Sequence, residues 1–192
     1  MKPRFANRSR LRTHLTSQRD DFAAAGDALS RHIAARYGVA VVWSDVPDPF
    51  KGDLDGCSIV ISRGSSPEDR LFLVAHLFGH TVQWNTCDHS RRLGMMIPSK
   101  PDAALLDTLE AYEREACRYS QAALHEAGVT AFDQWLADYS ACDLAFLRHL
   151  YLTGERCECR RFWLAGQPLI TPSAIPAFTP RHWGRRIEGI VL

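Results

Sequence analysis

Hydrophobic residues recur at helical spacing along much of the chain. This periodicity predicts three helices, over about residues 20–37, 101–127 and 133–152. A fourth stretch, 67–84, is apolar nearly throughout. Ser66 followed by Pro67 gives it a typical helix start, because Ser caps the free N–H groups and Pro fits the first helical turn. The chain is therefore predicted to be mostly helical.

Two short runs rich in β-branched residues, 39–43 and 57–62, are typical of strands. Asp, Pro and Gly in the segment between them predict a loop over 44–56. The polar, basic stretch 85–100 is interpreted as a connection. Together these patterns predict an α+β fold with a small β-sheet next to the apolar helix.

The 192 residues suffice for one well-buried core, and no linker composition interrupts them. We expect a basic flexible arm over 1–18 and a single domain over 19–192. Within that domain the core spans 34–127, and a C-terminal helix and extended wrap span 129–192. The arm region carries basic residues and no acid up to position 19: Lys2, Arg4, Arg8, Arg10, Arg12 and Arg19. A solvated arm is the first interpretation, and nucleic-acid contact by the arm is the second.

Two histidines, His76 and His80, stand four residues apart on the apolar helix. At that spacing both imidazoles lie on one helix face and can reach one metal ion. On so apolar a helix they are expected to be at least partly buried, where an imidazole needs a partner. In the H-E-x-x-H motif of zinc peptidases the residue after the first His is a Glu that acts as general base. Here that residue is Leu77.

A third ligand is expected from the helix over 101–127, which offers Glu110, Glu113 and Glu115. Glu113 flanks the apolar stripe and is the first choice, with Glu115 second, while Glu110 points away. The competing interpretation is that all three are solvated carboxylates of an amphipathic helix.

The chain resembles the ImmA/IrrE metallopeptidase-like family, compact zincin-type domains associated with bacterial regulators and mobile elements. The resemblance covers most of 34–124. It rests on two motifs, the apolar run ending in H-L-F-G-H at 76–80 and the E-R-E-A segment at 113–116. It implies a zincin-like fold and the metal ligands His76, His80 and Glu113, with zinc as the first expectation and iron(II) as the alternative.

Leu77 departs from the family at the position of the base, because leucine can neither accept nor pass on a proton. We therefore expect peptidase activity to be altered or lost. The first hypothesis is a regulatory pseudopeptidase that binds a peptide or protein. The alternative is a metal-dependent enzyme, either a hydrolase with a relocated base or a non-haem Fe(II)-type enzyme acting on a small substrate.

Four residues are candidates for a relocated base: Glu110, Glu115, Asp88 and His89. The acids Asp138 and Asp143 carry no motif and are interpreted as surface or packing residues, as is His149.

Six cysteines show no spacing typical of a secreted disulfide domain, and the N-terminus lacks the apolar region of a signal peptide. No apolar run is long enough for a membrane span. A cytoplasmic protein is expected. Cys87 is a candidate latent ligand on the metal, and Cys157 with Cys159 is a candidate second metal site.

Overall fold

The computed structural model describes residues 7–46, 50–96 and 100–184, with the backbone alone for 7–17. Its elements follow the chain in this order: α1 (Asn7–Tyr37), β1 (Ala40–Ser44), β2 (Gly52–Leu54), β3 (Ser58–Ser62), α2 (Pro67–Thr86), α3 (Asp88–Gly94), α4 (Ala103–Glu126), α5 (Asp133–Thr153) and a 3₁₀ turn, η1 (Cys159–Phe162). The expected α+β class, mostly helical with a small sheet beside the apolar helix, is confirmed.

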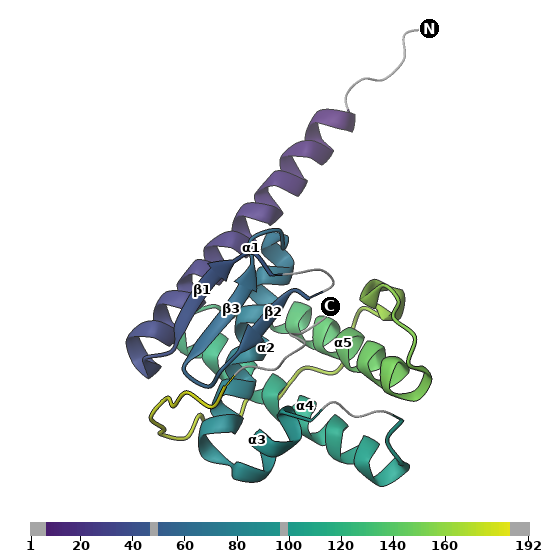
Figure 1. The fold of residues 1–192 in the computed structure, drawn as a ribbon. Helices are drawn as coiled ribbons and strands as arrows, with labels where there is room; N and C mark the ends of the chain where they lie inside the picture. Colours follow the sequence, from purple (N-terminus) through teal and green to yellow (C-terminus); the bar gives the residue numbers. More distant parts are fainter. Residues whose placement is uncertain (1–6, 47–49, 97–99, 185–192) are drawn as a thin grey trace, which may run out of the picture.

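The three strands form one mixed sheet with the order β1–β3–β2. β1 runs parallel to β3, with Val41 opposite Ile59, and β2 runs antiparallel to β3, with Asp53 opposite Val60. α2 packs against β2 and β3, while α1 packs against both α2 and β1 (Figure 1). The sheet therefore covers one side of α2 and leaves another side to the helices.

α2 is the centre of the core, because every residue from Leu71 to Trp84 is buried. Such a helix is apolar on all sides and needs neighbours all round it. It begins as the sequence predicts: Pro67 occupies the first turn, and the Ser66 hydroxyl accepts a hydrogen bond from the N–H of Asp69.

The closest neighbour of α2 is α4, and the two helices meet at Gly79 and Ala116. A Cβ atom at position 79 would lie far inside van der Waals distance of the Ala116 carbonyl. The two backbones approach this closely because glycine has no Cβ atom. The Ser120 hydroxyl reinforces the approach by donating a hydrogen bond to the Ala75 carbonyl oxygen at 2.9 Å. This contact brings Glu113 beside the two histidines.

Three expectations need correction. Residues 7–18, expected to be an irregular arm, form the first turns of α1, whose N-terminal half extends beyond the rest of the chain in Figure 1. β2 lies within the predicted loop 44–56, where three residues find hydrogen-bond partners on β3. α3 lies within the predicted connection 85–100, and it is too short and polar to show a periodicity. The division into arm and domain stays a prediction.

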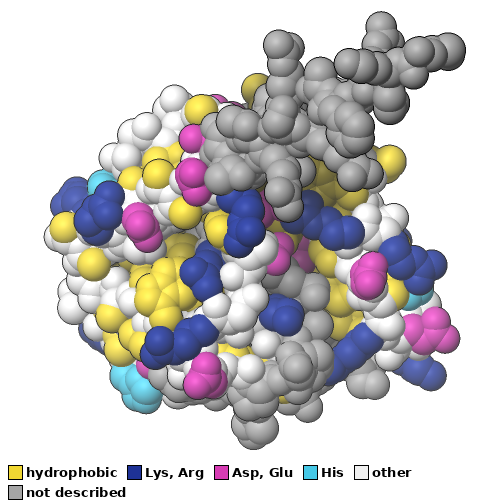
Figure 2. All heavy atoms as spheres, turned by 90° about the horizontal axis from the view of Figure 1, so that it is seen from above, with side chains coloured by type: hydrophobic (Ala, Val, Ile, Leu, Met, Phe, Trp, Pro, Cys, Tyr) yellow, Lys and Arg dark blue, Asp and Glu magenta, His cyan; other side chains and the backbone are white. Residues whose placement is uncertain are grey.

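After η1 the chain has no further helix or strand within the described residues, and it runs over the surface in extended form. Ile170, Ile175 and Phe178 pack against the main core on the way. No helix in the described part of the chain is long and apolar enough to cross a membrane. On the face shown in Figure 2, basic and acidic side chains are interspersed among hydrophobic ones.

The close approach at Gly79 predicts opposite effects for one substitution at two helical glycines. Gly79→Ala should lower the free energy of unfolding by about 1–3 kcal/mol or more, because the new methyl group meets backbone. Gly26→Ala in α1, where the nearest atom is the Leu71 Cα at 4.0 Å, should raise it by about 0.5–1 kcal/mol, since alanine favours helix. Urea unfolding of both variants measures the difference, and equal effects would contradict the packing described.

Candidate metal centre

His76 and His80 from α2 and Glu113 from α4 bring three ligand atoms to one buried point. The His80 Nε2 lies 3.0 Å from the His76 Nε2 and 3.0 Å from a Glu113 carboxylate oxygen. The same oxygen lies 3.2 Å from the His76 Nε2. All three residues are buried, and their ligand atoms form a group that could hold a metal ion. The structure thus brings together the three residues chosen from the sequence.

These separations match a tetrahedral metal site. Metal–ligand bonds of about 2.0–2.2 Å at tetrahedral angles place neighbouring ligand atoms roughly 3.3–3.5 Å apart. The three observed distances are close to this range, and the donor set of two imidazoles and one carboxylate suits a divalent ion. The geometry is therefore compatible with a bound divalent metal.

The ring orientation of His80 is fixed by Gln83, one turn further along α2. The Gln83 side-chain nitrogen donates hydrogen bonds to the Tyr112 carbonyl oxygen at 2.8 Å and to the Glu115 carboxylate at 2.7 Å. Because both partners are acceptors, the amide oxygen must be the atom that faces His80 Nδ1, at 2.8 Å. Nδ1 must then carry the proton, and the Nε2 of the neutral ring keeps its lone pair.

This tautomer makes the contact between His80 and Glu113 unfavourable unless a cation is present. The lone pair of the His80 Nε2 and the carboxylate oxygen of Glu113 face each other at 3.0 Å in a buried site. Two acceptors at this distance repel each other, and burial strengthens the repulsion. A metal ion held by both groups would offset this repulsion.

Burial and mutual contacts shift the pKa values of His80, His76 and Glu113. Burial lowers the pKa of His80; the Glu113 carboxylate opposes the shift, and the charge on His76 adds to it. Burial also opposes the charge on His76, but contacts with Cys117 and Glu113 outweigh it and raise the pKa of His76 well above its usual value. Burial favours the neutral acid of Glu113, yet its contact with the protonated His76 lowers its pKa. Without a metal, a proton on His76 therefore supplies the positive charge.

The other nitrogen of His76, Nδ1, faces the thiol of Cys117 on α4 at 3.8 Å. A ligand histidine usually donates its second N–H to a carboxylate, a backbone carbonyl or a water, and here a sulfur stands in that place. Cys117 was not singled out from the sequence. Cys117 lies among the buried, mostly apolar residues of α4, as Leu124 does one heptad later. Nothing in this sequence pattern indicates a role at the site.

Leu77 belongs to the core and not to the site. Its side chain is fully buried, and it packs beneath β2, since a Cβ at Gly52 would lie 3.0 Å from the Leu77 Cδ1. Leu77 is not among the residues that line the pocket beside the metal ligands.

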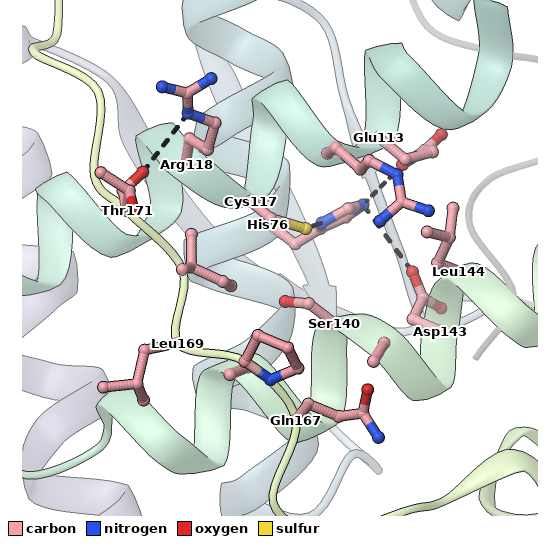
Figure 3. Close-up of a pocket in the computed structure, with 15 residues that line it drawn as sticks. His76, Glu113, Cys117, Arg118, Ser140, Asp143, Leu144, Gln167, Leu169 and Thr171 are labelled. Atoms are coloured by element: carbon pink, nitrogen blue, oxygen red, sulfur yellow. Dashed lines mark hydrogen bonds and ion pairs between the residues drawn. The ribbon is translucent and has the colours of Figure 1, made fainter. Parts of the chain in front are cut away.

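A pocket of about 520 Å³ opens beside the cluster, between α4, α5 and the extended segment 167–171 (Figure 3). His76 and Glu113 form part of its wall. Leu144, Leu169 and Ile170 give it an apolar lining, and Arg118 stands at one side, where its Nε donates a hydrogen bond to the Thr171 carbonyl oxygen at 3.3 Å. The three candidate ligands are therefore adjacent to a space of the size that small ligands occupy.

Two polar residues of α5 line this pocket, and sequence reasoning missed both. Asp143 was interpreted as a surface or packing residue, but it is buried, with a carboxylate oxygen 3.9 Å from the His76 Nε2. The buried hydroxyl of Ser140 has no hydrogen-bond partner in the described part of the chain. Burial and the nearby charge of Glu113 raise the pKa of Asp143 to about 7, although His76 opposes the shift. No motif marks these residues, because tertiary packing alone brings α5 to the site.

The structure gives the other candidate residues different surroundings. Glu115, the second choice as ligand, accepts the hydrogen bond from Gln83. Among the substitutes considered for the base, Glu110 pairs with Arg148, Asp88 pairs with Arg91 at 2.8 Å, and His89 is exposed. In the described residues none of these joins the group of converging ligand atoms.

The cysteine candidates also lie outside that group. Cys87 is exposed at the junction of α2 and α3, where hydrogen bonds with Ser90 lower the pKa of its thiol. Cys159 is buried, with its sulfur 3.6 Å from that of Cys142, whereas Cys157 is half-exposed. Within the described residues no set of metal-ligand atoms gathers around Cys157 and Cys159.

A further group, Asp55, Cys57 and His182, has ligand atoms close together. The Asp55 carboxylate already accepts hydrogen bonds from the N–H groups of Cys57 and Ser58, at 2.9 and 2.7 Å, and from the Ser58 hydroxyl. Burial opposes its charge, but these hydrogen bonds lower its pKa. His182 is largely exposed, and its Nδ1 lies 3.3 Å from the Asp55 oxygen that also accepts from the Ser58 hydroxyl. This contact holds the C-terminal segment to the turn before β3.

No protein-family model matches the chain, and no curated protein or solved structure matches it either. The resemblance to the ImmA/IrrE family therefore stays a prediction.

The role of Gln83 predicts that it affects metal binding without touching the metal. Gln83→Leu should weaken zinc binding by about 10–100-fold, because His80 loses the acceptor that fixes its tautomer. Gln121→Leu is the matched control, since Gln121 on α4 is also buried and also contacts a histidine four residues away, His125, but lies outside the cluster. Competition with a chromophoric chelator measures both affinities, and equal losses in the two variants would contradict the assigned role.

Proposed function

We propose that this chain is a zincin-type metal-binding protein, similar to the ImmA/IrrE metallopeptidases, in which His76, His80 and Glu113 hold a divalent metal ion. The observation that carries the proposal is the contact of the His80 Nε2 with the Glu113 carboxylate at 3.0 Å, given that Gln83 leaves the nitrogen unprotonated. The near-tetrahedral separations and the two imidazole ligands support zinc as the metal.

A zinc ion bound here would polarise a carbonyl group and lower the pKa of water. The side chains around it differ from those of a conventional zinc peptidase. Leu77 offers no proton acceptor, and it is packed into the core beneath β2. We infer that peptidase chemistry of the usual kind is altered or lost.

The pocket supports a binding role for the remaining site. Its volume, about 520 Å³, accommodates a few residues of a peptide or a small molecule. Apolar side chains such as Leu144 and Leu169 line it, and Arg114 and Arg118 add positive charge. We propose a regulatory pseudopeptidase that holds a peptide or protein segment in this pocket.

A metal-dependent enzyme is the second candidate. Two histidines and one carboxylate beside a pocket also describe the non-haem iron(II) arrangement, so iron replaces zinc in this alternative. A hydrolase with a relocated base would need an acid elsewhere on the pocket wall, and Asp143 occupies such a position.

Two further expectations stay proposals. The cytoplasmic location rests on the cysteine spacing of the sequence, which is not that of a secreted disulfide domain. Nucleic-acid contact by the arm 1–18 depends on side chains outside the described residues.

Metal analysis of the purified protein tests the proposal directly. We expect about one zinc ion per chain, and a loss of affinity greater than about 100-fold in His76→Ala, His80→Ala and Glu113→Gln, because each variant lacks one of three ligands. Inductively coupled plasma mass spectrometry after dialysis measures the metal and separates zinc from iron.

His125→Ala and Glu110→Gln are the controls, since both residues lie on α4 and pair with groups outside the cluster. They should retain the metal. A native protein that holds no divalent metal, even after incubation with zinc, would overturn the proposal.

A further inference from the structure

Asp143 stands at the metal position on the side that faces the pocket. Its carboxylate oxygen approaches the Nε2 of His76, the same nitrogen that converges with His80 and Glu113 (Figure 3). A carboxylate that merely orients a ligand histidine contacts the ring nitrogen that does not bind the metal. In His76 that nitrogen is Nδ1, and it faces the thiol of Cys117. Asp143 is therefore directed at the metal position itself.

Asp143 lies farther from the His76 Nε2 than the other ligand atoms do. Its oxygen is 3.9 Å from the His76 Nε2, against 3.0–3.2 Å among the ligand atoms, and it falls outside the converging group. A carboxylate just beyond the ligands has room for one small group between itself and the metal. This is the position from which a side chain contacts whatever occupies the open position of a three-ligand site.

The surroundings of Asp143 leave it available for such a contact. The residue is 4 % exposed, and the His76 Nε2, at 3.9 Å, is beyond hydrogen-bond distance of its carboxylate. A buried carboxylate is costly unless it is hydrogen-bonded, so a ligand that brings a donor closer than this gains affinity. Ser140, one turn earlier on α5, is buried in the same wall with an unpartnered hydroxyl. Both side chains lie in the pocket lining in Figure 3.

We propose that Asp143 is the acidic group that acts on the open position of the metal centre, in place of the carboxylate missing at Leu77. The proposal rests on metal binding by the three ligands, and it adds a hydrogen-bond acceptor that a pure binding role does not require. Its ligands are small molecules or peptide groups that combine a metal-binding oxygen with an N–H or O–H donor.

Under the second candidate function, a hydrolase, Asp143 would be the relocated base for an amide substrate. The oxygen of a water in the pocket forms a bond to the carbonyl carbon while its proton passes to the Asp143 carboxylate. As the C–N bond breaks, the proton moves on to the leaving nitrogen, so that amide and water give a carboxylic acid and an amine. Neither an oxidant nor a reductant takes part.

Acetohydroxamate tests this arrangement without requiring a known substrate. It chelates a metal through two oxygens. Its N–H group can donate a hydrogen bond to a carboxylate beside the metal. Titration of the cobalt(II)-loaded protein, followed by the visible absorption of the metal, should show binding. Asp143→Asn should weaken that binding by about ten- to a hundredfold while still holding one metal ion per chain, because a hydrogen bond to a charged group is lost.

Asp138→Asn is the matched control. Asp138 is a buried aspartate on the same helix, but it accepts hydrogen bonds from Gln134 and from the N–H of Gln167, at 2.9 and 2.8 Å. This variant should bind acetohydroxamate as the native protein does. Retention of one cobalt ion by each variant also shows that α2 and α4 are folded.

Three results would overturn the proposal for Asp143: equal binding by native protein and Asp143→Asn, no binding by the metal-loaded native protein, or loss of the metal in Asp143→Asn, which would make the residue a ligand. Failure of the native protein to bind cobalt or zinc at all is a different result. It removes the proposed metal centre, and the inference with it.

Discussion

The hydrogen bond between His80 and Gln83 determines what the centre of this protein can do. The side-chain nitrogen of Gln83 donates hydrogen bonds to Tyr112 and Glu115, so the side-chain oxygen accepts one from His80 Nδ1. The lone pair on the other ring nitrogen then faces the Glu113 carboxylate at 3.0 Å. In a buried site such a pair requires a positive charge. Without a metal, a protonated His76 supplies that charge. A metal ion satisfies all three groups at once.

The same constraint links the site to the core. The ligands are buried because α2 is buried on every side, and Glu113 reaches them because Gly79 lets α4 approach closely. The face of α2 that meets the sheet carries Leu77 into the core beneath β2. The ligand cluster instead borders α4 and α5, and the pocket lies on that side. A carboxylate acting on the metal must therefore come from the pocket wall, and Asp143 does.

Local patterns predicted most helices and two of three strands, because periodicity and caps are encoded within each segment. Ser66 and Pro67 marked the start of α2 correctly. The pair His76 and His80 was visible because helical spacing alone aligns them, and Glu113 followed from the apolar stripe of α4. β2 was missed because its three residues depend on pairing with β3. Asp143 and Cys117 were missed because their importance arises from packing between helices distant in sequence.

Zinc K-edge X-ray absorption on the protein as purified tests the central claim most directly. The account predicts a first shell of nitrogen and oxygen atoms alone, at about 2.0–2.2 Å, with the outer-shell scattering of two imidazole rings. Sulfur in the first shell, at about 2.3 Å, would contradict it, because the metal would then be held by cysteines in place of His76, His80 and Glu113.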